Sequence, residues 1–130
     1  MRTKKAALLC RLTVAFILIM IGVTACEYET IEIDLPDPTE EVSFAADILP
    51  IFTSNNNCTA CHGAGGTPPN LTAGSAYTSI VPDLVDLSEP ASSVIYVTPS
   101  PASSVHGFKK YTQAEAALVL LWIEQGAENN

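Results

Sequence analysis

Two cysteines and a histidine in the middle of the chain carry groups that can hold a cofactor. Cys58, Cys61 and His62 form the pattern C-x-x-C-H, which is the attachment signature of c-type haem. The two thiols add across the vinyl groups of the porphyrin, and two intervening residues in a tight helical turn match the spacing of those groups. The imidazole of His62 then lies beneath the iron as its proximal ligand. The pattern therefore predicts one covalently bound haem c.

Other kinds of site also use the C-x-x-C part of this pattern, namely redox dithiols and zinc sites. A zinc site needs two further ligands, but after residue 26 the chain has one other histidine, His106, and no other cysteine. A thioredoxin-like dithiol is expected within a βαβ pattern, which the sequence lacks. Haem attachment is therefore the favoured interpretation.

Short helices joined by long loops are expected to position these residues. Apolar residues recur at helical spacing, and neither strand alternation over a whole domain nor an internal repeat is evident. Loops rich in glycine and proline are expected mainly at residues 63–74 and 98–107. The sequence therefore predicts an all-α fold of three to four short helices. Their expected positions are residues 47–53, 75–81, 88–96 and 113–125.

Helix ends are predicted from capping residues and prolines. The first helix should begin near residues 46–47, so that Pro50 lies in its first turn, where the missing N–H has no helical partner to lose. Ser75 is the expected N-cap of the second helix, which should end before Pro82. Ser88 is the expected N-cap of the third.

The last helix has the clearest pattern. Thr112 and Glu115 have the spacing of a capping box, in which each side chain binds the backbone N–H of the other residue. Gly126 follows the last turn, where a left-handed C-terminal cap is typical. The apolar stripe predicted between them consists of Leu118, Leu121 and Trp122.

Residues 43–130 resemble a known family. The resemblance rests on Ser43-Phe44, on the segment from Asp47 to Phe52, on the C-x-x-C-H motif, and on the segment from Trp122 to Ala127. These strings are similar to the small cytochrome c domains of envelope proteins in Bacteroidota and Planctomycetes. The resemblance implies a class I-like cytochrome c fold, in which the first and last helices cross beside one haem. It also implies packing near that crossing by Phe52, Leu118 and Trp122.

A second short string extends this resemblance. Pro69, Asn70 and Leu71 resemble the Pro-Asn-Leu segment that follows the haem motif in class I cytochromes c. The resemblance implies that the carbonyl of Pro69, or that of Pro68, accepts a hydrogen bond from Nδ1 of His62 and raises its basicity. An ordinary loop proline is the alternative.

The N-terminal segment, residues 1–25, has the features of a secretory signal. Four basic residues precede an apolar stretch at residues 12–23, which is too short for a membrane span of ~20 residues. The string from Val23 to Cys26 resembles a bacterial lipobox, which implies that Cys26 becomes the lipidated first residue. The chain is therefore expected to be lipid-anchored in a bacterial cell envelope, at the periplasmic face or the cell surface.

Removal of this segment limits the choice of the second iron ligand. Met1 and Met20 are the only methionines, and both are lost with the segment. Class I cytochromes c usually supply a methionine from the loop before the last helix, so the chain departs from the family here. His106 is the only histidine besides His62, and it lies in that loop, seven residues before Gln113. We therefore predict a His62–Fe–His106 site. Its potential should be lower than that of a His/Met cytochrome, because methionine ligation raises the potential.

The residues after His106 support its position and offer alternatives. Gly107 permits close approach of the backbone to a haem. Lys109 and Lys110 are alternative ligands. An open or water-filled sixth position is the remaining possibility.

Acidic residues dominate the rest of the chain. Residues 26–42 carry seven of them beside two prolines, which is typical of an extended tether between the lipid anchor and the domain at 43–130. After residue 25 the chain has two basic and fourteen acidic residues, a formal charge of −12. Such a charge excludes nucleic-acid binding through phosphates and favours redox partner proteins with basic docking surfaces.

These features predict an electron carrier rather than an enzyme. Two protein ligands would leave no open position on the iron, and no catalytic acid–base cluster is evident. Two other functions stay open, namely a haem-relay subunit of a larger envelope oxidoreductase and an open-site sensor or peroxidase-like module. The last lacks a distal arginine, because both arginines lie before residue 26.

Overall fold

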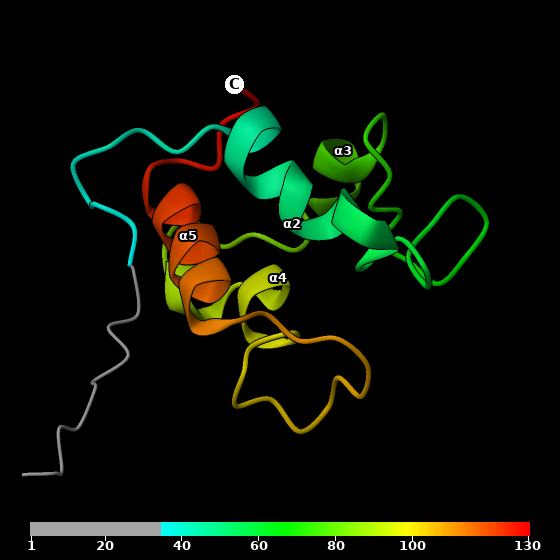
Figure 1. Ribbon diagram of the computed structural model, residues 1–130. Helices are drawn as coiled ribbons and strands as arrows, with labels where there is room; N and C mark the ends of the chain where they lie inside the picture. Colours follow the sequence, from blue (N-terminus) through cyan, green and yellow to red (C-terminus); the bar gives the residue numbers. More distant parts are fainter. Residues whose placement is uncertain (1–34) are drawn as a thin grey trace, which may run out of the picture. The chain divides into compact units, whose positions relative to one another are not determined.

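Helices and loops make up the part of the protein described by the computed structural model, residues 35–130 (Figure 1). These residues contain no strand, which confirms the predicted all-α class. The predicted signal segment, Cys26 and most of the acidic tether lie outside the described residues. Between residues 35 and 130, no helix combines the length and the apolar character needed to cross a membrane.

The first helical segment begins earlier than the sequence predicts. A π-helix, η1 (Phe44–Ile48), leads directly into α2 (Leu49–Thr53). Pro50 lies in the first turn of α2 as expected. The wider turn ahead of it is closed by the Leu49 N–H, which donates to the carbonyl of Phe44. Ser43 caps η1 through its hydroxyl, which accepts from the Ala46 N–H at 3.1 Å.

Three short helical pieces cover the middle of the chain. The helix α3 (Ala76–Ile80) ends before Pro82 as predicted, but the Ser75 side chain makes no capping hydrogen bond. The helix expected over residues 88–96 is divided into the 3₁₀ turn η3 (Pro90–Ser92) and α4 (Val94–Val97).

The division has a local cause. Ser93 is extended between η3 and α4, and its buried hydroxyl accepts from the Asp86 N–H at 2.9 Å. The predicted cap, Ser88, is itself bound by Asp86, whose carboxylate accepts from the N–H groups of Ser88 and Glu89. The prediction of Ser88 as a helix cap is wrong: the N-cap of η3 is Glu89, which makes no side-chain capping hydrogen bond, and Asp86 instead closes the turn ahead of η3.

The last helix, α5 (Gln113–Glu124), has both predicted ends. The Thr112 hydroxyl accepts from the Glu115 N–H at 3.1 Å, and the Glu115 carboxylate accepts from the Thr112 N–H at 2.7 Å. At the other end Gly126 has a φ of 107°, and the Ala127 N–H donates to the carbonyl of Trp122. These contacts form a C-terminal motif of the Schellman type.

The buried face of α5 differs from the predicted stripe. Trp122 is buried as expected, but Leu118 and Leu121 are only half-buried. The other buried side chains of the helix are Ala116, Val119 and Ile123. Because α5 is apolar on several sides, its sequence does not reveal which side faces the core.

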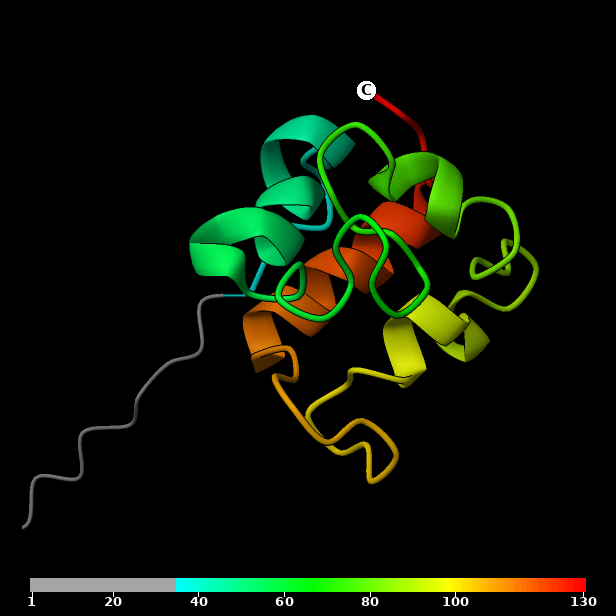
Figure 2. The ribbon, with the colours of Figure 1, turned by 90° about the vertical axis from the view of Figure 1, so that its right-hand side faces the viewer.

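An aromatic cluster joins the first and last helices. Phe44 of η1 lies 5.2 Å from Tyr77 and 5.4 Å from Trp122, measured between ring centroids. The helix α5 crosses the middle of the unit, with η1 and α2 on one side and α4 on the other (Figure 2). The two ends of the described chain are therefore held together by their packing.

Polar contacts strengthen this junction. The side chain of Gln125 accepts from the Val42 N–H and donates to the carbonyl of Glu40, both at 2.8 Å. The side-chain carbonyl of Asn130 accepts from the Phe44 N–H at 2.8 Å. The sequence suggests that the domain begins at Ser43. The packed part of the chain begins a few residues earlier.

Candidate functional site

The C-x-x-C-H motif forms a helical turn directly after the 3₁₀ helix η2 (Ser54–Asn56). The N–H groups of Cys61 and His62 donate to the carbonyl of Cys58, at 3.2 and 2.9 Å. The Cys58 N–H in turn donates to the carbonyl of Phe52 at 2.9 Å, which fixes the turn to the end of α2. Both cysteines are free thiols, with Cys58 half-buried and Cys61 exposed. Burial raises the pKa of the Cys58 thiol, although nearby Lys109 opposes this.

The imidazole of His62 is oriented by the backbone of the following loop. Its Nδ1 lies 3.0 Å from the carbonyl oxygen of Thr67. Because a carbonyl only accepts, this contact requires the hydrogen on Nδ1 and leaves Nε2 as the nitrogen that can bind a metal. The acceptor is thus Thr67, and the prediction of Pro69 or Pro68 in this role is wrong. Pro69 instead lines the pocket beside the ring.

A tight loop explains why Thr67 reaches the ring. The Thr67 N–H donates to the carbonyl of Cys61 at 2.9 Å, so the chain turns back on the motif within a few residues. A Cβ at Gly66 would lie 2.4 Å from the Cys61 carbonyl oxygen, and one at Gly63 would lie 2.8 Å from that of Thr59. Only glycine fits such close approach. The spacing of these glycines is the sequence signal that could have pointed to Thr67.

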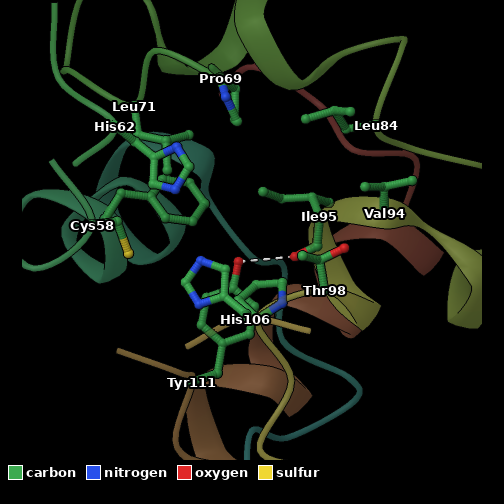
Figure 3. Close-up of a pocket in the computed structure, with 12 residues that line it drawn as sticks. Cys58, His62, Pro69, Leu71, Leu84, Val94, Ile95, Thr98, His106 and Tyr111 are labelled. Atoms are coloured by element: carbon green, nitrogen blue, oxygen red, sulfur yellow. Dashed lines mark hydrogen bonds between the residues drawn. The ribbon is translucent and has the colours of Figure 1, made fainter. Parts of the chain in front are cut away.

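His106 lies on the loop between α4 and α5, and this loop brings it opposite His62. The two ring centroids are 6.1 Å apart, and the ring planes differ by 15° (Figure 3). The Nδ1 atom of His106 is buried and has no hydrogen-bond partner among the described residues. An unpaired buried nitrogen costs free energy, which favours a ligand at this position. The structure therefore brings together the two histidines that the sequence predicts as iron ligands.

The space around the two rings is apolar on its inner side. A pocket with about 460 Å³ of space, partly open to solvent, contains His62, His106 and Cys58 in its lining. Its other walls include Phe52, Leu71, Leu84, Val94 and Ile95. Tyr111 also lines this pocket; its hydroxyl donates to the carbonyl of Ile95 at 3.0 Å, and burial raises its pKa strongly.

A second hollow, of about 610 Å³, lies on the outer side of the same residues and is open to solvent. It is lined by both cysteines and both histidines, together with Thr67, Val105, Phe108 and Lys109. Neither hollow has a carboxylate in its lining. A flat cofactor could therefore extend from the apolar pocket to the exposed thiol of Cys61.

The chemistry of these groups fits a haem c. The porphyrin supplies four nitrogens, so the iron needs only one or two protein ligands, and the facing imidazoles provide two. The free thiols lie at one edge of the same space, and the unpaired Nδ1 of His106 belongs to its wall. Within residues 35–130, no group of three or more His, Cys, Asp or Glu side chains is arranged to hold a metal ion by itself.

Comparison of the chain with known protein families, curated proteins and solved structures finds no match. What the site binds has to be inferred from its own residues. Its distinctive features are the facing imidazoles of His62 and His106 and the adjoining thiols of Cys58 and Cys61.

Proposed function

We propose that residues 43–130 form a class I-like cytochrome c domain that transfers electrons through one covalently bound haem c. Cys58 and Cys61 hold the porphyrin, and His62 and His106 bind the iron. The observation that best supports this proposal is the near-parallel pair of imidazoles, 6.1 Å apart, beside the free thiols of the motif.

The bound haem supplies one-electron chemistry, and the surrounding residues set how easily it proceeds. The Thr67 carbonyl accepts from Nδ1 of His62 and makes the imidazole a stronger donor. The apolar wall excludes water from the inner side of the pocket. With His62 and His106 both bound, no position is left for a substrate. The site therefore suits electron transfer at a lower potential than a His/Met site.

CO binding separates an open-site haem module from a carrier or a relay subunit. A sensor or peroxidase-like module needs an open sixth position, whereas a carrier or a relay subunit does not. Rapid and complete CO binding by the reduced wild-type protein would favour the open site, and slow or partial binding would favour ligation by His106. Purification of the native protein from envelope membranes would separate a free carrier from a subunit of a larger complex.

The location proposed for this domain is the surface of a bacterial envelope membrane. Lipidation of Cys26 would anchor the chain, and the acidic tether would let the domain reach partners. Labelling of cells with a radioactive fatty acid tests this part, because a Cys26→Ala variant should lose the label. Retention of the label by that variant would contradict the lipid anchor.

The haem itself is tested by expression in a bacterium equipped for cytochrome c maturation. After denaturing electrophoresis, wild-type protein should keep haem-dependent peroxidase staining, because thioether bonds survive denaturation. A Cys58→Ser, Cys61→Ser variant should lose it. The matched control is Ala60→Ser, which adds a hydroxyl inside the same turn at an exposed position and leaves both thiols in place.

The outcomes of this experiment separate the hypotheses. Staining of the wild type and of Ala60→Ser, with none in the double variant, supports covalent haem. Absence of staining in the wild type, together with stoichiometric zinc in the purified protein, would instead favour a metal-binding C-x-x-C pair and overturn the proposal.

A further inference from the structure

The positive charge of the described chain is concentrated beside the proposed haem site. Residues 35–130 contain ten acidic residues but only two basic ones, Lys109 and Lys110. Lys109 lines the outer hollow together with Cys61 and is the only charged side chain there, histidines aside. The Lys110 ammonium is half-buried and donates to the carbonyl of Ser103 in the same loop. The local charge at this edge of the site is thus opposite to the net charge.

Exposed apolar side chains lie beside these lysines. Val105 is 81% exposed and Phe108 is 72% exposed, and both line the same hollow. A single exposed apolar residue is ordinary, but neighbouring aromatic and aliphatic side chains that are both exposed suit the centre of a protein interface, and the lysines beside them suit its polar rim. We call residues 105–110 the lysine loop.

The backbone of the lysine loop also has an unusual conformation. Lys109 has a φ of 40°, in the left-handed region that lysine rarely adopts. Such conformations persist where the surrounding structure imposes them, and they occur often at functional sites. Glu115 lines a third hollow together with Lys109, but its carboxylate is bound to the Thr112 N–H in the capping box.

We propose that the lysine loop is the docking surface for a redox partner protein whose facing surface is acidic. This inference rests on the proposed electron-transfer function and deepens it. Lys109 and Lys110 meet carboxylates of the partner, and Phe108 contacts an apolar spot between them. The net charge of the whole chain favours basic partners at long range. The charges beside the outer hollow select an acidic surface at contact, because ions screen distant charges more than near ones.

The first experiment measures how fast the reduced haem protein gives one electron to small oxidants of opposite charge. Anionic hexacyanoferrate(III) is reduced to hexacyanoferrate(II), and cationic tris(phenanthroline)cobalt(III) is reduced to its cobalt(II) form, each leaving ferric haem. Ionic strength is varied from about 0.01 to 0.1 M, which shortens the Debye length from about 30 to 10 Å. If electrons leave the protein at the lysine loop, the rate constant for hexacyanoferrate(III) should fall several-fold as the ionic strength rises. A protein that reacts through its net negative charge would show the reverse.

Two variants with equal charge changes locate the effect. Lys109→Gln with Lys110→Gln should abolish the slowing of the anion by salt. Ala91→Glu with Asn129→Asp changes the net charge by the same amount at exposed positions outside both hollows, and it should leave the slowing unchanged. Equal effects of the two variants would overturn the proposal, because only the net charge would then matter.

The second experiment uses a protein donor, an acidic plant-type ferredoxin, which passes one electron to the ferric haem. Phe108→Ala should lower this second-order rate constant several-fold, and by a clearly larger factor than it changes the rates with either small reagent. An unchanged rate with ferredoxin would contradict a role for Phe108 in docking.

Two further outcomes would overturn the docking proposal in distinct ways. Sedimentation of the wild type with vesicles of anionic phospholipid, lost in the double lysine variant, would assign the lysine loop to a membrane surface instead. A covalent haem whose reaction with the anion accelerates with salt would refute the docking surface alone. Absence of covalent haem would instead refute the proposed function on which it rests.

Discussion

The two histidines of the site are held in different ways. His62 belongs to a hydrogen-bonded turn and has a partner for its Nδ1, whereas His106 lies on a long loop and its Nδ1 has none among the described residues. Under the proposed haem ligation, loss of His106 should therefore leave the haem attached and His62 in place.

We expect His106→Ala to convert a low-spin haem into one with a weak or absent sixth ligand. The reduced variant should bind CO faster than the wild type does, because no protein side chain competes. Visible and EPR spectra measure the ligation, and stopped-flow measures CO binding. Ser104→Ala is the control in the same exposed loop. An unchanged low-spin spectrum in His106→Ala would remove His106 from the ligand set.

The second residue-scale prediction concerns the loop behind His62. Gly66→Ala places a Cβ 2.4 Å from the Cys61 carbonyl oxygen, so the loop has to shift and the contact between Thr67 and His62 should weaken. A less basic imidazole stabilises ferric iron less, so the reduction potential should rise. The shift is ~59 mV for each tenfold change in relative affinity for the two oxidation states.

A redox titration of the purified haem protein measures this shift. Gly74→Ala is the matched control, because a Cβ there meets nothing within 4 Å. A potential that falls, or equal shifts in the two variants, would show that the Thr67 contact does not tune the site.

At the scale of elements, α5 is the only helix with a capping box among the described residues. Thr112→Ala removes the hydroxyl that accepts from the Glu115 N–H. The expected loss is ~1 kcal/mol of unfolding free energy, or about 4–8 °C in Tm for a domain of this size.

Urea unfolding of the haem-loaded protein measures that loss. Gln113→Ala is the control one residue further along, since its exposed side chain makes no capping contact. If both variants unfold at the same urea concentration, the capping box contributes nothing measurable.

The elements that the sequence predicted correctly are those set by contacts between residues close together in the chain. The cap of α5 and its glycine end depend on neighbours three to five residues away, so the sequence was sufficient. The helix expected over residues 88–96 was divided because Ser93 binds the backbone of Asp86 across a turn. Which side chains of α5 are buried, and that Leu118 is only half-buried, depends on how α5 packs against η1, η3 and α4, which no local pattern encodes.

At the scale of the whole molecule, the apolar pocket and the stability of the fold are linked through Tyr111. This side chain lines the pocket, is buried, and donates to the carbonyl of Ile95. Burial raises its pKa, so the phenol stays neutral in the folded protein at pH values where the unfolded chain ionises, above about 10. The stabilisation of the fold by the buried phenol of Tyr111 is therefore complete below that pH and is lost as the pH rises further.

We expect Tyr111→Phe to unfold more easily than the wild type at pH 7, by ~1 kcal/mol, because one buried hydrogen bond is lost. Above pH 10 the difference in unfolding free energy between the wild type and the variant should narrow by up to about 1.4 kcal/mol per pH unit, since phenylalanine does not titrate. Urea unfolding at pH 7, 10 and 11 measures both effects, with Tyr96→Phe as a less buried control. A gap that stays constant across this range would refute the linkage.

The sequence by itself determined the all-α class, the helical turn of the C-x-x-C-H motif and the ends of α5. Each of these depends on residues a few positions apart, whose backbone preferences and hydrogen bonds act locally. The sequence also named His106 as the partner of His62, although it could not tell how the loop would carry it there.

Only the tertiary structure decided which groups meet across the chain. In the structure, the carbonyl of Thr67 rather than that of Pro69 accepts the hydrogen bond from His62, because the close turn at Gly66 sets how far the loop extends. The structure also placed Lys109, one of the two lysines of the acidic domain, beside the C-x-x-C-H motif. Net charge can be counted along a sequence, but the charge at one edge of a site depends on which loops fold over it.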